Sequence, residues 1–132
     1  MKKLLLILCL LSMASHAEWK SYDNNNTDTD VFYIDYSRIK TEGRYKSMWY
    51  LDDTKSPKTD SSGKQFKSSV TKSIIDCQGS RLQTVAIYRY SEQMGNGEVI
   101  LSNSRPLEES QWIFPPPGSI FDGHITIACG SK

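Results

Sequence analysis

The residues best able to do chemistry in this chain are its cysteines and histidines, which are Cys9, Cys77, Cys129, His16 and His124. A cysteine serves as a nucleophile when a neighbouring base holds it as a thiolate. It serves as a metal ligand within a Cys and His cluster, or as half of a disulfide. The choice depends on the compartment and on how many partners remain in the mature protein.

Residues 1–17 have the pattern of a secretory signal peptide. Two lysines give a positive start, an apolar run covers residues 4–11, and residues 15–17 include small side chains at the cleavage positions. Cleavage after Ala14 satisfies the same rule. The apolar run is shorter than the roughly 20 residues of a membrane-spanning helix. We therefore expect an exported protein with one domain, residues 18–132, and no transmembrane segment.

Export decides between the uses of Cys77. Two cysteines remain after cleavage, Cys77 and Cys129, and an even count in an exported chain indicates a disulfide with one possible pairing. His124 is then the single imidazole of the domain, so a histidine pair for zinc is absent from the sequence. We expect His124 to be a surface or packing residue, and we predict no catalytic, cofactor-binding or metal-binding residue and no enzyme activity.

Two acidic stretches deserve comparison with metal and acid–base sites. The run DNNNTDTD, residues 23–30, alternates carboxylates and amides, but Asp28 and Ile34 stand where an EF-hand loop needs glycine and glutamate. Asp52 and Asp53 are adjacent, and adjacent residues of a strand point to opposite faces. We interpret both stretches as solvated loops. The mature domain has 14 basic and 15 acidic residues, which does not favour nucleic-acid binding.

The rest of the chain is typical of strands separated by turns. The stretches rich in aromatic and β-branched residues predict strands, and they are 31–36, 45–51, 70–77, 81–90, 98–102 and 112–114. Residues 52–68 are polar and rich in helix and strand breakers, and they predict a long mobile loop. No connection has the length of a crossover helix, so we expect one antiparallel, meander-like sheet of five to six strands.

Residues 119–129 fit either a helix or a strand. Ser119 suits a helix N-cap, and Asp122 lies where the helix dipole favours an acid. Gly123 weakens a helix, and the run of residues 125–127 favours a strand.

Aromatic residues are the feature that points to binding. The mature chain holds three tryptophans and seven tyrosines. Most of them fill a core, but a domain of this size exposes some tyrosines among basic and hydroxyl side chains. Such a surface suits protein partners.

Taken together, the sequence resembles the surface-adhesin protein E family, small exported proteins of Gram-negative bacteria. The resemblance runs over nearly the whole mature chain and is carried by short segments, which are 32–35, 48–51, 67–69, Asp76-Cys77 with Arg81, 90–95, Trp112, 117–119 and Cys129.

The resemblance implies an α+β fold in which a C-terminal helix is tethered to one face of the sheet by the disulfide Cys77 to Cys129. It also implies adhesion to host extracellular-matrix and serum proteins such as laminin, vitronectin and plasminogen. The shared positions carry structural roles, so no binding residue is transferred.

Some adhesins of the family are anchored by a lipid. This chain has Leu8 before Cys9, which does not fit a lipobox, so the protein is expected in the periplasm or at the cell surface. The alternative function is a periplasmic envelope protein that binds a bacterial partner.

Overall fold

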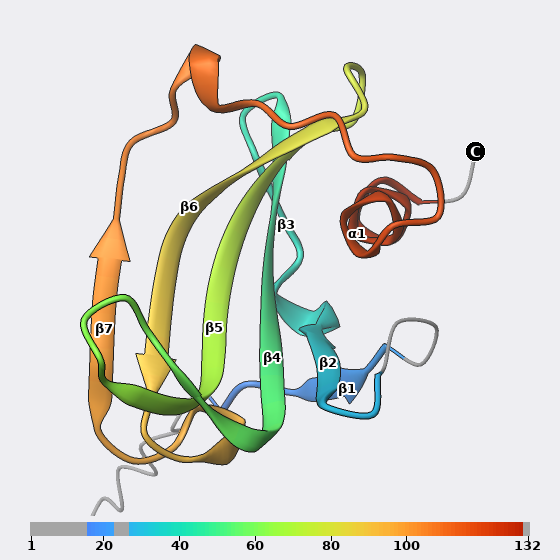
Figure 1. Cartoon of the computed structure of the whole chain (residues 1–132). Helices are drawn as coiled ribbons and strands as arrows, with labels where there is room; N and C mark the ends of the chain where they lie inside the picture. The colour runs from blue at the N-terminus through green and yellow to red at the C-terminus, as the bar shows by residue number, and fades with distance from the viewer. Residues whose placement is uncertain (1–15, 23–26, 131–132) are drawn as a thin grey trace, which may run out of the picture.

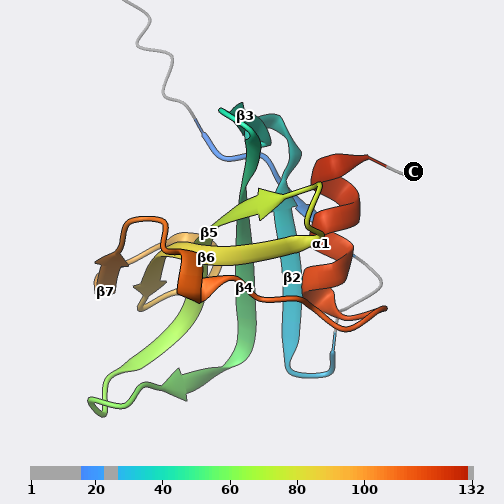
Figure 2. The same cartoon turned by 90° about the horizontal axis from the view of Figure 1, so that it is seen from above.

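The described part of the chain forms one curved antiparallel sheet with one helix against it. The computed structural model describes residues 16–22 and 27–130, so the signal peptide predicted at 1–17 lies almost wholly outside the described residues. The sheet has seven strands, ordered β1-β2-β4-β5-β6-β7, with β3 paired to β4. Figure 1 shows the strands and the helix, and Figure 2 shows them from above. The strands are β1 (Trp19–Ser21), β2 (Asp30–Asp35), β3 (Lys40–Glu42), β4 (Tyr45–Thr59), β5 (Gln65–Asp76), β6 (Arg81–Tyr90) and β7 (Val99–Ser104).

The α+β prediction is confirmed, with more strands than expected. The two short strands β1 and β3 were not predicted, because three residues are too few to show a period. The predicted strand at 112–114 is wrong, since only an isolated bridge joins Ile113 to Leu82. The residues that the structure describes also form the short 3₁₀ turns η2 (Tyr36–Arg38), η3 (Gln93–Gly95) and η4 (Glu109–Gln111).

The long loop predicted at 52–68 is also wrong, because β4 continues to Thr59 and β5 begins at Gln65. The turn between them is held by Asp60, whose Oδ1 accepts hydrogen bonds from the Ser62 and Lys64 backbone N–H groups at 2.9 and 3.0 Å. Thr54 and Ser68 of these strands are buried, and their hydroxyls donate to backbone carbonyls at 3.0 and 2.6 Å, so a polar composition did not mean a loop here.

The C-terminal segment is the helix α1 (Ile120–Cys129). Ser119 caps it by accepting a hydrogen bond from the Asp122 backbone N–H at 3.3 Å. Ile125 and Ala128 are buried against the core residues Ile34, Met48, Ile75 and Leu82. This burial outweighs the strand preference of residues 125–127, because most helix stability in proteins comes from packing.

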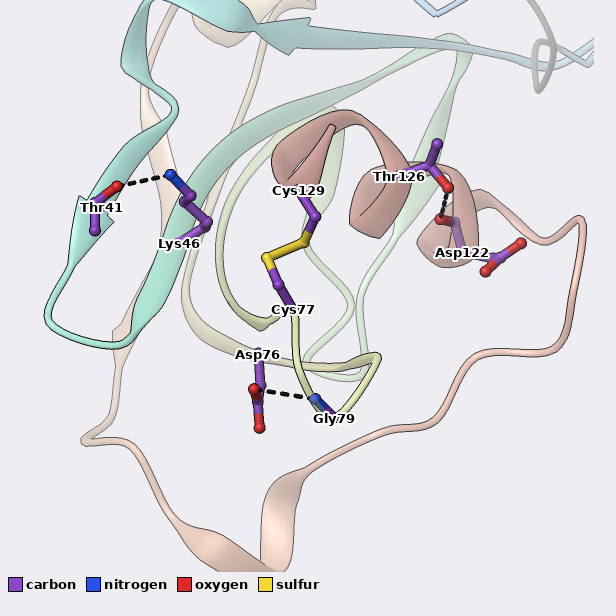
Figure 3. The surroundings of a disulfide bond; sticks show 8 residues. All are labelled: Thr41, Lys46, Asp76, Cys77, Gly79, Asp122, Thr126 and Cys129. Atoms are coloured by element: carbon purple, nitrogen blue, oxygen red, sulfur yellow. Dashed lines mark hydrogen bonds between the residues drawn. A yellow bond between two sulfur atoms is a disulfide. The ribbon is translucent and has the colours of Figure 1, made fainter. Parts of the chain in front are cut away.

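The disulfide ties the end of α1 to the end of β5. Cys77 and Cys129 are bonded across 52 positions of sequence, and Figure 3 shows the bridge between the helix and the hairpin turn. In that turn, Asp76 accepts a hydrogen bond from the Gly79 N–H at 3.2 Å and pairs with Arg81 at 2.8 Å. The stretch around Cys77 is therefore an anchor for the helix.

Candidate binding surface

The two faces of the sheet differ because α1 covers only one of them. On β4, Met48 and Tyr50 pack toward the helix, and Trp49 between them points to the opposite face. There Trp49 meets Tyr88 of β6, with ring centroids 6.2 Å apart and ring planes 31° from parallel. Two further rings, Trp19 of β1 and Tyr90 of β6, lie around the same hollow. We call these four half-buried rings the aromatic face.

The aromatic face surrounds a shallow hollow of about 240 Å³. Its lining is completed by Val70 of β5 and by Arg38 of η2. The carboxylate of Asp35, which is fully buried, holds the Arg38 Nε at 3.3 Å and accepts a hydrogen bond from the Glu18 backbone N–H at 3.3 Å. This pairing fixes a cationic side chain beside four aromatic rings, which is a composition enriched in protein interfaces.

A polar network closes one end of the aromatic face. Asp53 accepts a hydrogen bond from the Met94 backbone N–H at 2.8 Å. Ser68 donates to the Glu92 carbonyl at 2.6 Å and accepts from the Gly95 N–H at 2.9 Å. Met94 has a φ of 59°, in the left-handed region that is unfavourable for residues other than glycine. These three hydrogen bonds therefore stabilise a backbone conformation of η3 that is unfavourable by itself.

Of the other sequence candidates, Asp53 belongs to this polar network, whereas Asp52 lies apart from the aromatic face. Asp52 and Asp53 do point to opposite faces, and they belong to β4 and not to a loop. On the helix side, Lys58 pairs with Asp30 at 2.6 Å and with Asp52 at 3.7 Å. Burial raises the pKa of Asp52 to about 6, with the nearby Asp30 adding to the rise and Lys58 opposing it. Half of the stretch compared with a calcium loop, residues 23–26 of 23–30, lies outside the described residues.

His124 is a core residue, one of the two places expected for it. Its ring is fully buried and lies 4.7 Å from the Tyr50 ring and 5.8 Å from the Phe121 ring, centroid to centroid. Burial lowers the pKa of His124 to about 4.

Within residues 16–22 and 27–130, no three His, Cys, Asp or Glu side chains are grouped to hold a metal ion. In the same part of the chain, no helix has the length and apolarity to cross a bilayer.

Sequence reasoning found the aromatic excess but not the hollow. Trp19 and Arg38 were missed as members of one site, because 19 positions separate them in sequence and the short β1 gives no periodic signal. The period of two along residues 45–51 predicts that Trp49 lies on the face opposite Met48 and Tyr50, and the structure places it there. Tyr88 and Tyr90 show the same alternation on β6, which is the signal that could have grouped them.

This geometry defines a class: a small single-sheet protein with a rigid aromatic surface on the face that its helix leaves open. The sequence profile of the family described as surface-adhesin protein E matches residues 19–130. The chain therefore belongs to the surface-adhesin protein E family, as the sequence resemblance predicted.

Solved structures agree with the family in fold. Crystal form II of Haemophilus influenzae protein E is 14% identical, covers 86% of this chain and 96% of its own, and has a TM-score of 0.57. The selenomethionine form of the same protein is 16% identical, covers 80% and 89%, and has a TM-score of 0.55. At these identities the likeness shows the fold alone. No curated protein gives a significant match to the sequence.

Proposed function

We propose that this protein is an exported adhesin domain that binds a protein partner through the aromatic face. The observation that carries the proposal is the set of four half-buried rings on rigid strands, open on the side that α1 does not cover. Tryptophan and tyrosine supply most of the binding energy in many interfaces, because they bury large areas and lose little conformational freedom. Family membership makes adhesion the matching biological role.

The proposed partners are host extracellular-matrix or serum proteins, with laminin, vitronectin and plasminogen as the first candidates. We propose that residues 1–17 direct export and that the mature domain, residues 18–132, acts at the cell surface. No cofactor is needed, because surface complementarity is sufficient for binding. The core position of His124 supports a non-enzymatic role, since its imidazole has no exposed surface on which to meet a substrate.

The test is a binding assay with matched aromatic variants. The mature protein is measured against immobilised laminin, vitronectin and plasminogen in physiological salt. We expect saturable binding to at least one of them and a loss of about tenfold or more for Trp49→Ala, as for an interface hot spot. Phe114→Ala is the control, because Phe114 is 68% exposed and does not line the hollow.

Equal losses for Trp49→Ala and Phe114→Ala would contradict the assignment of the aromatic face. Circular dichroism checks that both variants fold. Tyr88→Ser supplies a second variant of the same surface, so the conclusion does not depend on one substitution. Cell fractionation and surface proteolysis decide the location. Protein that is confined to the periplasm would favour the alternative role, binding of a bacterial envelope partner.

A further inference from the structure

The strand β7 forms an open edge of the sheet. It is last in the strand order and pairs with β6, and Figures 1 and 2 both place it at the side away from α1, with no other described element beyond it. At the opposite edge, β1 has only three residues. Since β7 has six, it is the longer of the two templates for pairing with another chain.

Backbone groups on β7 alternate between β6 and the outside. The Arg105 N–H donates to the Val85 carbonyl at 2.9 Å, and Ser104 lies opposite Ala86. In an antiparallel pair this pattern directs alternate residues to the neighbouring strand. Asn103 therefore pairs with β6, whereas the N–H and C=O groups of Ser102 and Ser104 point outward.

Natural proteins usually protect such an edge with lysine, proline, an inward charge or a β-bulge. The strand β7 reads VILSNS, has no lysine, proline or charged residue, and carries its bulge at the start, at Ile100. Val99 is 51% exposed. The one irregularity is a register shift at Ile100, near the start of the strand. Residues 101–104 are therefore a regular, uncharged edge that another strand can join.

We propose that an extended segment of the bound partner protein adds to the sheet along β7, antiparallel to it. This inference rests on the proposed function and specifies how the partner is held. Ser102 lies opposite Tyr88, and Val99 lies opposite Tyr90, so the edge continues the aromatic face. A hollow of about 200 Å³ between the middle of β6 and the end of β7, lined in part by Ala86 and Ser104, accepts one side chain of the added strand.

Charges at the two ends of β7 set the direction and chemistry of the segment. Glu98 precedes the strand and Arg105 follows it, and both are exposed. An antiparallel segment meets Arg105 with its N-terminal end and Glu98 with its C-terminal end. The preferred segment therefore starts with an acidic residue, continues with uncharged strand formers and ends with a basic residue.

A second copy of this chain fits this edge less well than a foreign segment. If two copies pair antiparallel with Ser102 facing Ser102, the shifted residue Ile100 of one copy lies opposite Ser104 of the other. The extra residue at Ile100 interrupts the ladder there. A foreign segment meets this interruption once, where it passes Ile100, whereas a pair of two copies meets it twice. Self-association is therefore an outcome of the test that would count against the proposal.

The first experiment compares Ser102→Pro with Ser102→Ala in the binding assay described above. Proline removes an outward N–H and leaves the β6 ladder intact, because proline is tolerated on the open side of an edge strand. We expect Ser102→Pro to lose about tenfold or more of the affinity and Ser102→Ala to bind like the wild type. Circular dichroism and thermal unfolding confirm the fold of each. Equal binding by the two variants, with binding still sensitive to Trp49→Ala, would overturn the strand addition and leave the proposed function standing.

The second experiment needs no host protein. Beads display the peptide acetyl-Glu-Thr-Val-Thr-Val-Thr-Lys-amide, or a control with Glu and Lys exchanged, so that weak contacts add through avidity. We expect the fluorescently labelled protein to bind the first peptide about fivefold more strongly, and Ser102→Pro to abolish this binding. Equal binding to both peptides, or no binding, would overturn the proposal. So would a dimer in sedimentation that Ser102→Pro abolishes.

Discussion

His124 should make the fold sensitive to acid. The ring is fully buried among the aromatic rings of Tyr22, Tyr50 and Phe121. Neither ring nitrogen has a hydrogen-bond partner among the residues that the structure describes. Burial therefore favours the neutral imidazole and lowers its pKa from 6.5 to about 4.

The size of the effect follows from proton linkage. In the unfolded chain His124 binds a proton below pH 6.5, whereas in the folded protein it stays neutral until about pH 4. The unfolded state thus binds more protons between these values, and stability falls as the pH drops through this window. Between pH 7 and pH 5 the loss is about 2 kcal/mol, a large part of the 5–15 kcal/mol typical of a domain.

The assay is urea unfolding of the mature protein and of His124→Phe at pH 7 and pH 5. Phenylalanine keeps an aromatic ring in the cluster and removes the titration. We expect the free energy of unfolding to fall about 2 kcal/mol less in His124→Phe than in the wild type over this range. The imidazole proton signals of His124, followed by NMR, should titrate near pH 4.

Asp52 acts in the opposite direction and supplies the control. Its folded pKa is raised to about 6 by burial, so the folded state gains a proton more readily and stability rises as the pH falls from 6 toward 3.8. The comparison of wild type with His124→Phe is therefore repeated in the Asp52→Asn background, where this opposing contribution is gone. If His124→Phe shows the same pH dependence as its parent in both backgrounds, the reasoning about the buried imidazole is refuted.

Three further outcomes are expected from the scaffold. Replacing Cys77 and Cys129 with serine opens a link across 52 positions, and the free energy of unfolding in urea should fall by about 4 kcal/mol by the chain-entropy relation; a change below about 1 kcal/mol would contradict it. Gly123→Ala places a Cβ against the Tyr22 hydroxyl oxygen, so the melting temperature should drop, and the drop should be smaller when Tyr22→Ala is the parent; an equal drop in both parents would show that the contact is not the cause. Ser68→Ala removes two hydrogen bonds that hold η3 and should cost about 1–3 kcal/mol. Amide exchange that is unchanged in residues 92–95 would count against that role.

Gly123 shows why the helix could not be settled from sequence. Glycine lowers helix propensity by about 1 kcal/mol relative to alanine, and this counted against the helix. The structure gives the reason for glycine there: the Tyr22 ring, from a segment about 100 positions earlier, lies where a side chain would be. A contact between residues so distant in sequence leaves no periodic signal. In the sequence alone, the low helix propensity of Gly123 therefore counts as evidence for a strand.

Residues 52–68 show the opposite failure. Their polarity predicted a loop, but Thr54 and Ser68 are buried in long strands and bonded to backbone carbonyls at 3.0 and 2.6 Å. The regular strands at 31–36, 70–77 and 81–90 were predicted well, because each has enough aromatic and β-branched residues to show its character. Where hydrogen bonds to distant backbone groups replace apolar burial, composition alone gives the wrong element.

The alternation on β4 also determines how the binding surface can be tested. Trp49 lines the aromatic hollow, while its neighbours Met48 and Tyr50 pack in the core against α1. Removal of Met48 would create a cavity and cost about 2–5 kcal/mol of stability, and any loss of binding would then have two explanations. Trp49 is half-buried on the outer face, so its truncation changes the surface more than the core. The same strand thus offers an internal control. Truncation of Trp49 is expected to lower binding with little loss of stability, whereas truncation of Met48 is expected to lower stability.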